Sequence, residues 1–181
     1  MILEQFYLGC LSQASYLVAD EVSRRAVVVD PRRDIEEYLI AAAERRLRIE
    51  LVVLTHVHAD FVPGHIELAE HTGAQIAMSE LAPVDFAFRG LWDGEIITLG
   101  EPNGVSIEVL ATPGHTPESI TLAVRQHATD AAPTALLTGT RCSSATWAGP
   151  TCSARPAGPR TRWPGSCTAR CTARSCRCWM R

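Results

Sequence analysis

The 181-residue chain contains no lysine, so all 17 of its basic residues are arginines. It also has no apolar run of about 18 residues, the length that a helix needs to cross a bilayer. The N-terminal stretch carries Glu4 among its apolar residues and has no basic leader, which argues against a secretory signal peptide. From these absences we expect a cytoplasmic protein without a membrane partner.

Acidic residues are absent from the last part of the chain. All 20 of them lie in residues 1–139 with nine of the arginines, a balance of −11, whereas residues 140–181 carry the other eight arginines, a balance of +8. Cysteine is divided in the same way, because Cys10 stands alone and the other six of the seven cysteines lie at position 142 or later. A basic, cysteine-rich tail ordinarily indicates nucleic-acid or zinc binding.

Two further features of this tail argue against both kinds of binding. Its arginine, proline and glycine residues follow no hydrophobic pattern, so they cannot build a core. Its last four cysteines lack the paired Cys-x-x-Cys spacing of zinc sites: Cys167, Cys171, Cys176 and Cys178. We therefore expect residues 140–181 to be largely irregular and to bind no nucleic acid.

Residues 1–139 have the length and the hydrophobic pattern of one domain. Short apolar or alternating runs predict strands at 2–8, 14–19, 26–29, 49–54, 74–78, 95–99, 105–110, 119–124 and 134–137. Helical spacing predicts helices at 35–47, capped by Asp34, and at 64–71, ended by Gly73. Residues 79–94 are expected to form a surface loop. This order of elements predicts an α+β fold in which two packed sheets are flanked by helices.

Metal-binding side chains cluster after the strand at 49–54. His56, His58 and Asp60 follow it directly, and a later Pro-Gly turn carries His115. Imidazole is the commonest protein ligand for first-row metals, and a carboxylate adds a hard oxygen. We expect His56 and His115 to bind a metal, and His58 and Asp60 to support the chemistry, with Asp60 as an orienting group or proton acceptor.

Simpler interpretations of the same residues stay open. His56 and His58 are alternatively exposed residues of a loop, and Asp60 alternatively caps the helix that follows. His65 lies on that helix and is expected to have a structural role.

The segments that carry these residues resemble a known family. They are Leu-Glu-Gln-Phe-Tyr at 3–7, the Thr-His-Val-His-Ala-Asp stretch with its later Gly-His at 55–65, and Pro-Gly-His-Thr-Pro-Glu-Ser at 113–119. They resemble the metallo-β-lactamase superfamily and, within it, the persulfide dioxygenases, most of all the bacterial forms that are often fused to rhodanese domains. The resemblance covers residues 1–139. It implies an αββα sandwich with the metal at the edge where the strand-end loops meet.

Phe61 separates two functions within this superfamily. The two-zinc hydrolases carry histidine there as a ligand of the second metal, and phenylalanine has no lone pair to offer. One metal held by His56, His115 and a carboxylate instead favours Fe(II) and oxygen chemistry. The resemblance therefore implies one Fe(II) per chain, with zinc as the alternative. It also implies oxidation of a low-molecular-weight thiol persulfide, such as glutathione persulfide, by dioxygen to sulfite. The resemblance further implies a rhodanese domain as a partner protein or as a fused domain.

The resemblance ends after the strand at 134–137. The family pattern requires Thr-Gly-Asp there, and this chain has Thr138, Gly139 and Thr140. Back-translation of the tail with GC-rich codons, with one base restored after the Gly139 codon, reads Asp-Ala-Leu-Phe-Val-Gly-Asp-Val-Gly-Arg-Pro-Asp-Leu-Leu, which matches the family. We therefore interpret residues 140–181 as an out-of-frame translation.

This interpretation makes residues 1–139 an incomplete metallo-β-lactamase-like domain. Its third metal ligand, a carboxylate, is replaced by Thr140, so we expect the dioxygenase activity to be impaired. Two other functions stay open. One is a zinc-dependent thioester hydrolase of the glyoxalase II type, against which Phe61 argues, and the other is an inactive fragment.

Overall fold

The computed structural model describes residues 1–9 and 13–139, together with the backbone of two later strands, β11 (Thr168–Thr172) and β12 (Ser175–Trp179). These two strands pair with each other in antiparallel fashion. Cys10, Thr140 and the rest of the tail that the sequence predicts to be irregular lie outside the described residues.

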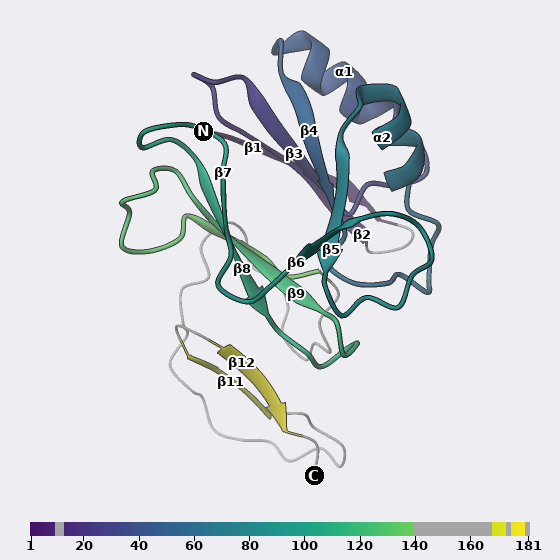
Figure 1. Ribbon diagram of the computed structural model, residues 1–181, viewed down its shortest axis with the longest axis vertical. Helices are drawn as coiled ribbons and strands as arrows, with labels where there is room; N and C mark the ends of the chain where they lie inside the picture. Colours follow the sequence, from purple (N-terminus) through teal and green to yellow (C-terminus); the bar gives the residue numbers. More distant parts are fainter. Residues whose placement is uncertain (10–12, 140–167, 173–174, 180–181) are drawn as a thin grey trace.

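Two β-sheets form the body of the molecule (Figure 1). The first sheet has six strands in chain order, β1 (Ile2–Leu8), β2 (Gln13–Ala19), β3 (Arg25–Val29), β4 (Arg48–Val53), β5 (Gln75–Ser79) and β6 (Arg89–Leu91). The second has four strands in the order β10 (Ala135–Leu137), β9 (Ile120–Arg125), β8 (Ser106–Ala111) and β7 (Ile96–Thr98).

Strand direction changes within the first sheet. Strands β1 to β3 are antiparallel, whereas β3 to β6 run parallel to one another. Parallel neighbours need crossover connections. Helix α1 (Glu36–Glu44) connects β3 to β4, and α2 (His65–Thr72) connects β4 to β5. Consequently the carboxyl ends of β3 and β4 lie at the same edge of the sheet.

Both faces of the first sheet are buried, which explains the continuous apolar run of β3. Val27 and Val29 pack into the core between the two sheets, against residues such as Ile107 and Leu122. Ala26 and Val28 pack on the opposite face, in the core that includes Tyr38 of α1. An uninterrupted apolar run is typical of a strand that is buried on both faces.

The α+β prediction is confirmed, and the described residues supply one helical layer and both sheets of the expected sandwich. Helices α1 and α2 cover the face of the first sheet that is turned away from the second sheet (Figure 1). Within residues 1–9 and 13–139, no helix covers the outer face of the second sheet. No helix in the described part of the chain is long and apolar enough to cross a membrane.

Most predicted elements are confirmed, and three predictions are wrong in part. The N-cap of α1 is Ile35 rather than Asp34, whose side chain only accepts a hydrogen bond of 3.3 Å from Glu36 N. Helix α1 ends at Glu44 rather than at residue 47, because Arg46 adopts a φ of 54°, which a right-handed helix does not allow. The segment 79–94, which the sequence predicts to be a loop, contains the short edge strand β6, which pairs with β5. Gly73 ends α2 in the left-handed conformation, as predicted.

Candidate metal centre

The predicted histidines meet where the carboxyl ends of β3 and β4 face the turn between β8 and β9. Asp30 follows β3, and residues 55–58 follow β4. The turn at 112–119 carries His115 and is joined to the 55–58 loop by a hydrogen bond from Ile120 N to Thr55 O of 2.9 Å. Loops beyond the carboxyl ends of parallel strands are a general place for binding sites.

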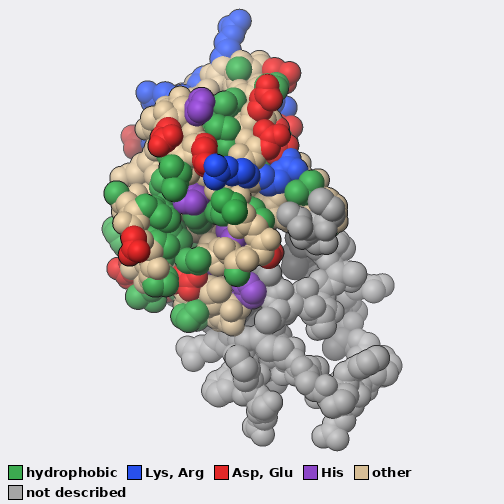
Figure 2. All heavy atoms as spheres, turned by 90° about the vertical axis from the view of Figure 1, so that its right-hand side faces the viewer, with side chains coloured by type: hydrophobic (Ala, Val, Ile, Leu, Met, Phe, Trp, Pro, Cys, Tyr) green, Lys and Arg blue, Asp and Glu red, His purple; other side chains and the backbone are tan. Residues whose placement is uncertain are grey.

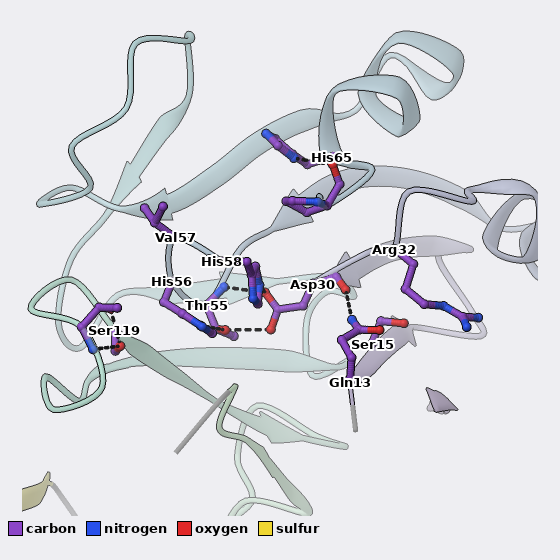
Figure 3. Close-up of polar contacts among 12 residues, drawn as sticks. Gln13, Ser15, Asp30, Arg32, Thr55, His56, Val57, His58, His65 and Ser119 are labelled. Carbon is purple, nitrogen blue, oxygen red and sulfur yellow. Dashed lines mark hydrogen bonds and ion pairs between the residues drawn. The ribbon is translucent and has the colours of Figure 1, made fainter. Parts of the chain in front are cut away.

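Asp30 is the centre of the polar contacts in this region (Figure 3). Its carboxylate accepts hydrogen bonds from Thr55 N at 2.8 Å, from Thr55 Oγ1 at 2.7 Å and from His58 Nε2 at 3.0 Å. Asp30 is only 2% exposed and has a φ of 50°, an uncommon conformation for a residue with a side chain. One buried carboxylate therefore fixes the loop that carries the histidines.

His56 is held so that one ring nitrogen is left for a ligand. Its Nδ1 lies 3.0 Å from Thr55 Oγ1, and the single hydroxyl proton of Thr55 is already donated to Asp30. The hydroxyl must then accept from Nδ1–H, so the lone pair of His56 is on Nε2. Burial, followed by the effect of a charge on His58, lowers the pKa of His56 from 6.5 to about 4, which keeps the imidazole neutral as a metal ligand requires.

In His58 the ring nitrogen left for a ligand is Nδ1, whereas in His56 it is Nε2. A carboxylate only accepts, so His58 donates Nε2–H to Asp30 and keeps its lone pair on Nδ1. This Nδ1 is buried and has no hydrogen-bond partner among the residues that the structure describes. The imidazole of His56 lies 4.1 Å from that of His58 and 5.0 Å from that of His115, centroid to centroid. Three imidazoles thus converge, as the sequence predicts.

Asp60 and Phe61 occupy the next two positions of the loop. Asp60 is exposed, and none of the hydrogen bonds recorded among the described residues involves it. The ring of Phe61 lies 4.4 Å from that of His58, where it provides an apolar wall rather than a donor. The proposed role of Asp60 as an orienting group has no support from a contact, and it stays a prediction.

His65 begins α2 and is buried, which agrees with the structural role expected of it. Its Nδ1 lies 3.2 Å from Pro63 O, and its ring packs 4.9 Å from that of Phe86. Burial is the main cause of a lowered pKa at His65. Figure 2 shows histidine side chains among patches of hydrophobic side chains on this side of the molecule. Val57 and Val62 are among the exposed hydrophobic residues near these histidines.

The residues present suit a metal ion only in part. The histidines offer neutral nitrogen donors, yet no group of three or more histidine, cysteine, aspartate or glutamate side chains in the described ranges is arranged to hold a metal. Gly139 approaches the same place, because a Cβ on it would lie 2.3 Å from Thr55 Oγ1 and 3.3 Å from His56 Nδ1. The chain therefore enters the site one residue before position 140, where the resemblance requires the carboxylate ligand.

Sequence reasoning missed two carboxylates at this site. The sequence pattern predicts a strand at 26–29 and gives no role to Asp30, which follows it directly. An aspartate that comes directly after a buried apolar run, at the edge that carries the histidines, is a usable signal. Glu118 is buried and accepts a hydrogen bond from Val57 N at 3.0 Å. No local pattern marks this contact, because it joins residues 61 positions apart.

Comparisons with known proteins agree with this geometry. A family model described as the metallo-beta-lactamase superfamily matches residues 8–127. The chain is 37% identical to the hydroxyacylglutathione hydrolase of Cereibacter sphaeroides over 122 residues, which are 64% of this chain and 45% of that protein. It is 32% identical to the human mitochondrial persulfide dioxygenase ETHE1 over 131 residues, which are 70% of this chain and 49% of that protein.

A solved structure repeats the similarity in three dimensions. The crystal structure of a metallo-beta-lactamase from Staphylococcus aureus superposes with a TM-score of 0.69 at 33% identity, over 76% of this chain and 42% of the other. The chain thus spans about half the length of the curated relatives described above. The matched family model covers more than half of this chain and includes both histidine loops, so the chain belongs to the metallo-β-lactamase superfamily.

Proposed function

We propose that this chain carries the site of a mononuclear iron persulfide dioxygenase, weakened by the residue at position 140. His56, through Nε2, and His115 would hold the ion. The observation that supports iron over a two-zinc site is Phe61, whose ring lies 4.4 Å from His58. A side chain without a lone pair cannot complete a second metal site at this position. When bound, iron would supply the site at which a persulfide, dioxygen and water react to give sulfite, a thiol and two protons.

The chain's own residues would orient and tune such a centre. Asp30 fixes the Thr55 hydroxyl, and that hydroxyl fixes the tautomer of His56, so its Nε2 lone pair is available at neutral pH. Asp30 likewise orients His58, whose Nδ1 lone pair is the remaining buried acceptor at this site. Phe61, whose ring packs against that of His58, would place an apolar wall beside the ion.

The second candidate is a zinc-dependent hydrolase of thioesters. It is supported by the 37% identity to a protein named hydroxyacylglutathione hydrolase, a similarity as high as that to the persulfide dioxygenase. Phe61 argues against it, because it removes a ligand of the second zinc.

Metal analysis and product analysis separate the two candidates. The chain with the reading frame restored after Gly139 is purified without oxygen and assayed for bound metal. We expect about one iron per chain, and oxygen-dependent release of sulfite from glutathione persulfide. Two zinc ions per chain, with thiol release from a glutathione thioester and no sulfite, would instead establish the hydrolase.

A further inference from the structure

Glu118 lies between the two loops that carry the histidines. It stands three residues after His115, and its Oε1 accepts a hydrogen bond at 3.0 Å from the backbone of Val57, the residue between His56 and His58. Its side chain is therefore positioned to couple both histidine loops. The turn on its own side is fixed by Ser119, whose hydroxyl lies 2.7 Å from Thr116 Oγ1.

The carboxylate of Glu118 stays charged although it is buried. Burial, the largest effect, raises its pKa, but the backbone N–H of Val57, the Thr116 hydroxyl and the nearby His56 together lower the pKa below its ordinary value. The residue is only 5% exposed. A negative charge is thus held inside the protein beside the imidazoles.

This charge has no arginine partner among the described residues, unlike another buried glutamate. Glu95 is 7% exposed and forms an ion pair with Arg89. None of the ion pairs between described residues includes Glu118. A buried charge without a counter-ion is costly. A cation held by the adjacent imidazoles would supply the missing compensation.

We propose that Glu118 is a positioning residue of the metal centre, which joins the two histidine loops and provides a buried negative charge that favours a divalent cation at His56 and His115. The inference rests on the proposed metal site but not on which metal fills it. The charge acts on iron and zinc alike, because it does not coordinate the ion. Glu118 acts through Val57 and through the electrostatic potential at the two histidines.

The test separates the charge of Glu118 from its hydrogen bond. Glu118→Gln keeps the shape and an acceptor for Val57 N–H but removes the charge. The affinity of the full chain for Co²⁺ and Zn²⁺ is measured by competition with a chromophoric chelator at neutral pH. We expect about a 10- to 100-fold loss of affinity, the range seen when groups behind metal ligands are removed. The unfolding midpoint of the metal-free protein should change little.

Glu95→Gln is the matched control, because it removes another buried carboxylate charge that is paired with an arginine rather than with the histidine loops. It should leave metal affinity unchanged. If Glu118→Gln does not fold, Glu118→Asp and Glu118→Asn are compared instead, since they differ only in charge. Glu118→Asp keeps the negative charge, so it should bind Co²⁺ and Zn²⁺ more tightly than Glu118→Asn.

The outcomes distinguish this inference from the proposed function. Equal metal affinity in Glu118→Gln and the unsubstituted chain would overturn the role of Glu118 and leave the dioxygenase proposal intact. Loss of affinity in a chain that binds two zinc ions would overturn the dioxygenase proposal and support Glu118. A frame-restored chain that binds neither Co²⁺ nor Zn²⁺ would overturn both.

Discussion

At the scale of single residues, the site is built from buried polar groups whose hydrogen bonds fix one protonation state. Thr55 donates to Asp30 and accepts from His56, so the proton position on His56 follows from a chain of two contacts. The same carboxylate orients His58. Such a chain specifies ligand orientation without any direct contact between Asp30 and a metal.

The pH dependence of stability should reveal the burial of His56. Its pKa is about 4 in the folded chain, against the ordinary value of 6.5 that applies when the chain is unfolded. Between these values the unfolded chain binds a proton that the folded chain does not, so stability is full above pH 6.5 and decreases as the pH falls to 4. The slope is at most about 1.4 kcal/mol per pH unit from this group. Urea unfolding in the presence of EDTA measures it.

His56→Gln is the control for that measurement, because it removes the titrating group while retaining a polar side chain. Its stability should vary less between pH 6.5 and 4 than that of the unsubstituted chain. Identical pH profiles for the two proteins would show that His56 is not the group responsible.

Phe61 should decide how many metal ions the frame-restored chain binds. Phe61→His places an imidazole next to His58 and near the carboxylate of Asp60. Because this returns the donor that a second site requires, zinc occupancy should rise from about one toward two ions per chain. Phe61→Leu removes the aromatic ring without adding a donor, so this variant should still bind about one zinc ion per chain. Unchanged zinc content in Phe61→His would mean that other residues close the second site.

At the scale of elements, the site depends on four segments that each reach the same edge. The ends of β3 and β4 bring Asp30 and the 55–58 loop, the β8–β9 turn brings His115, and the end of β10 brings Gly139. Gly139 has a φ of 57°, and its Cα faces Thr55 without room for a side chain. A small residue is therefore required where β10 enters the site.

Gly139→Ala should disturb both the fold and the site. Its Cβ would lie 2.3 Å from Thr55 Oγ1, and the backbone conformation itself disfavours a side chain. We expect a loss of roughly 2 kcal/mol in the free energy of unfolding, with weaker Co²⁺ binding because Thr55 and His56 must shift. Gly9→Ala is the control, since a Cβ there meets no atom within 4 Å. Equal stability of the two variants would contradict this account.

At the scale of the whole molecule, residues 1–139 supply both sheets and one helical layer but only part of a metal shell. The chain covers about half the length of the curated relatives to which it was compared. Two imidazoles without a carboxylate leave a divalent ion with too few ligands and too little compensating charge. Weak metal binding is therefore expected of the chain as it stands.

Thr140→Asp should strengthen metal binding in the otherwise unchanged chain. The residue follows Gly139, which lies against Thr55 and His56, and an aspartate there would restore the carboxylate of the family pattern. We expect at least a 10-fold higher affinity for Co²⁺, by analogy with the cost of losing even outer partners of metal ligands, about 10- to 100-fold. Thr134→Asp, at an exposed position, adds the same charge away from the site and should have no effect. Equal affinities would place the third ligand elsewhere.

The sequence by itself determined every described strand of the two large sheets except β6, the two helices and the meeting of the histidines. Apolar periodicity, the Gly73 helix end and the position of His56 and His58 directly after a buried strand are local features, so they can be read without the fold. Burial of β3 on both faces follows from its uninterrupted valines for the same reason.

Only the tertiary structure decided which groups support those histidines. The contacts of Asp30 with Thr55 and His58 span 25 and 28 residues, and that of Glu118 with Val57 spans 61. The contacts of Asp30 join the ends of two neighbouring strands of one sheet, and the contact of Glu118 joins loops of the two sheets. No local spacing encodes either arrangement. The edge strand β6 was missed for the same physical reason, because its three residues form a strand by pairing with β5 rather than through a pattern of their own.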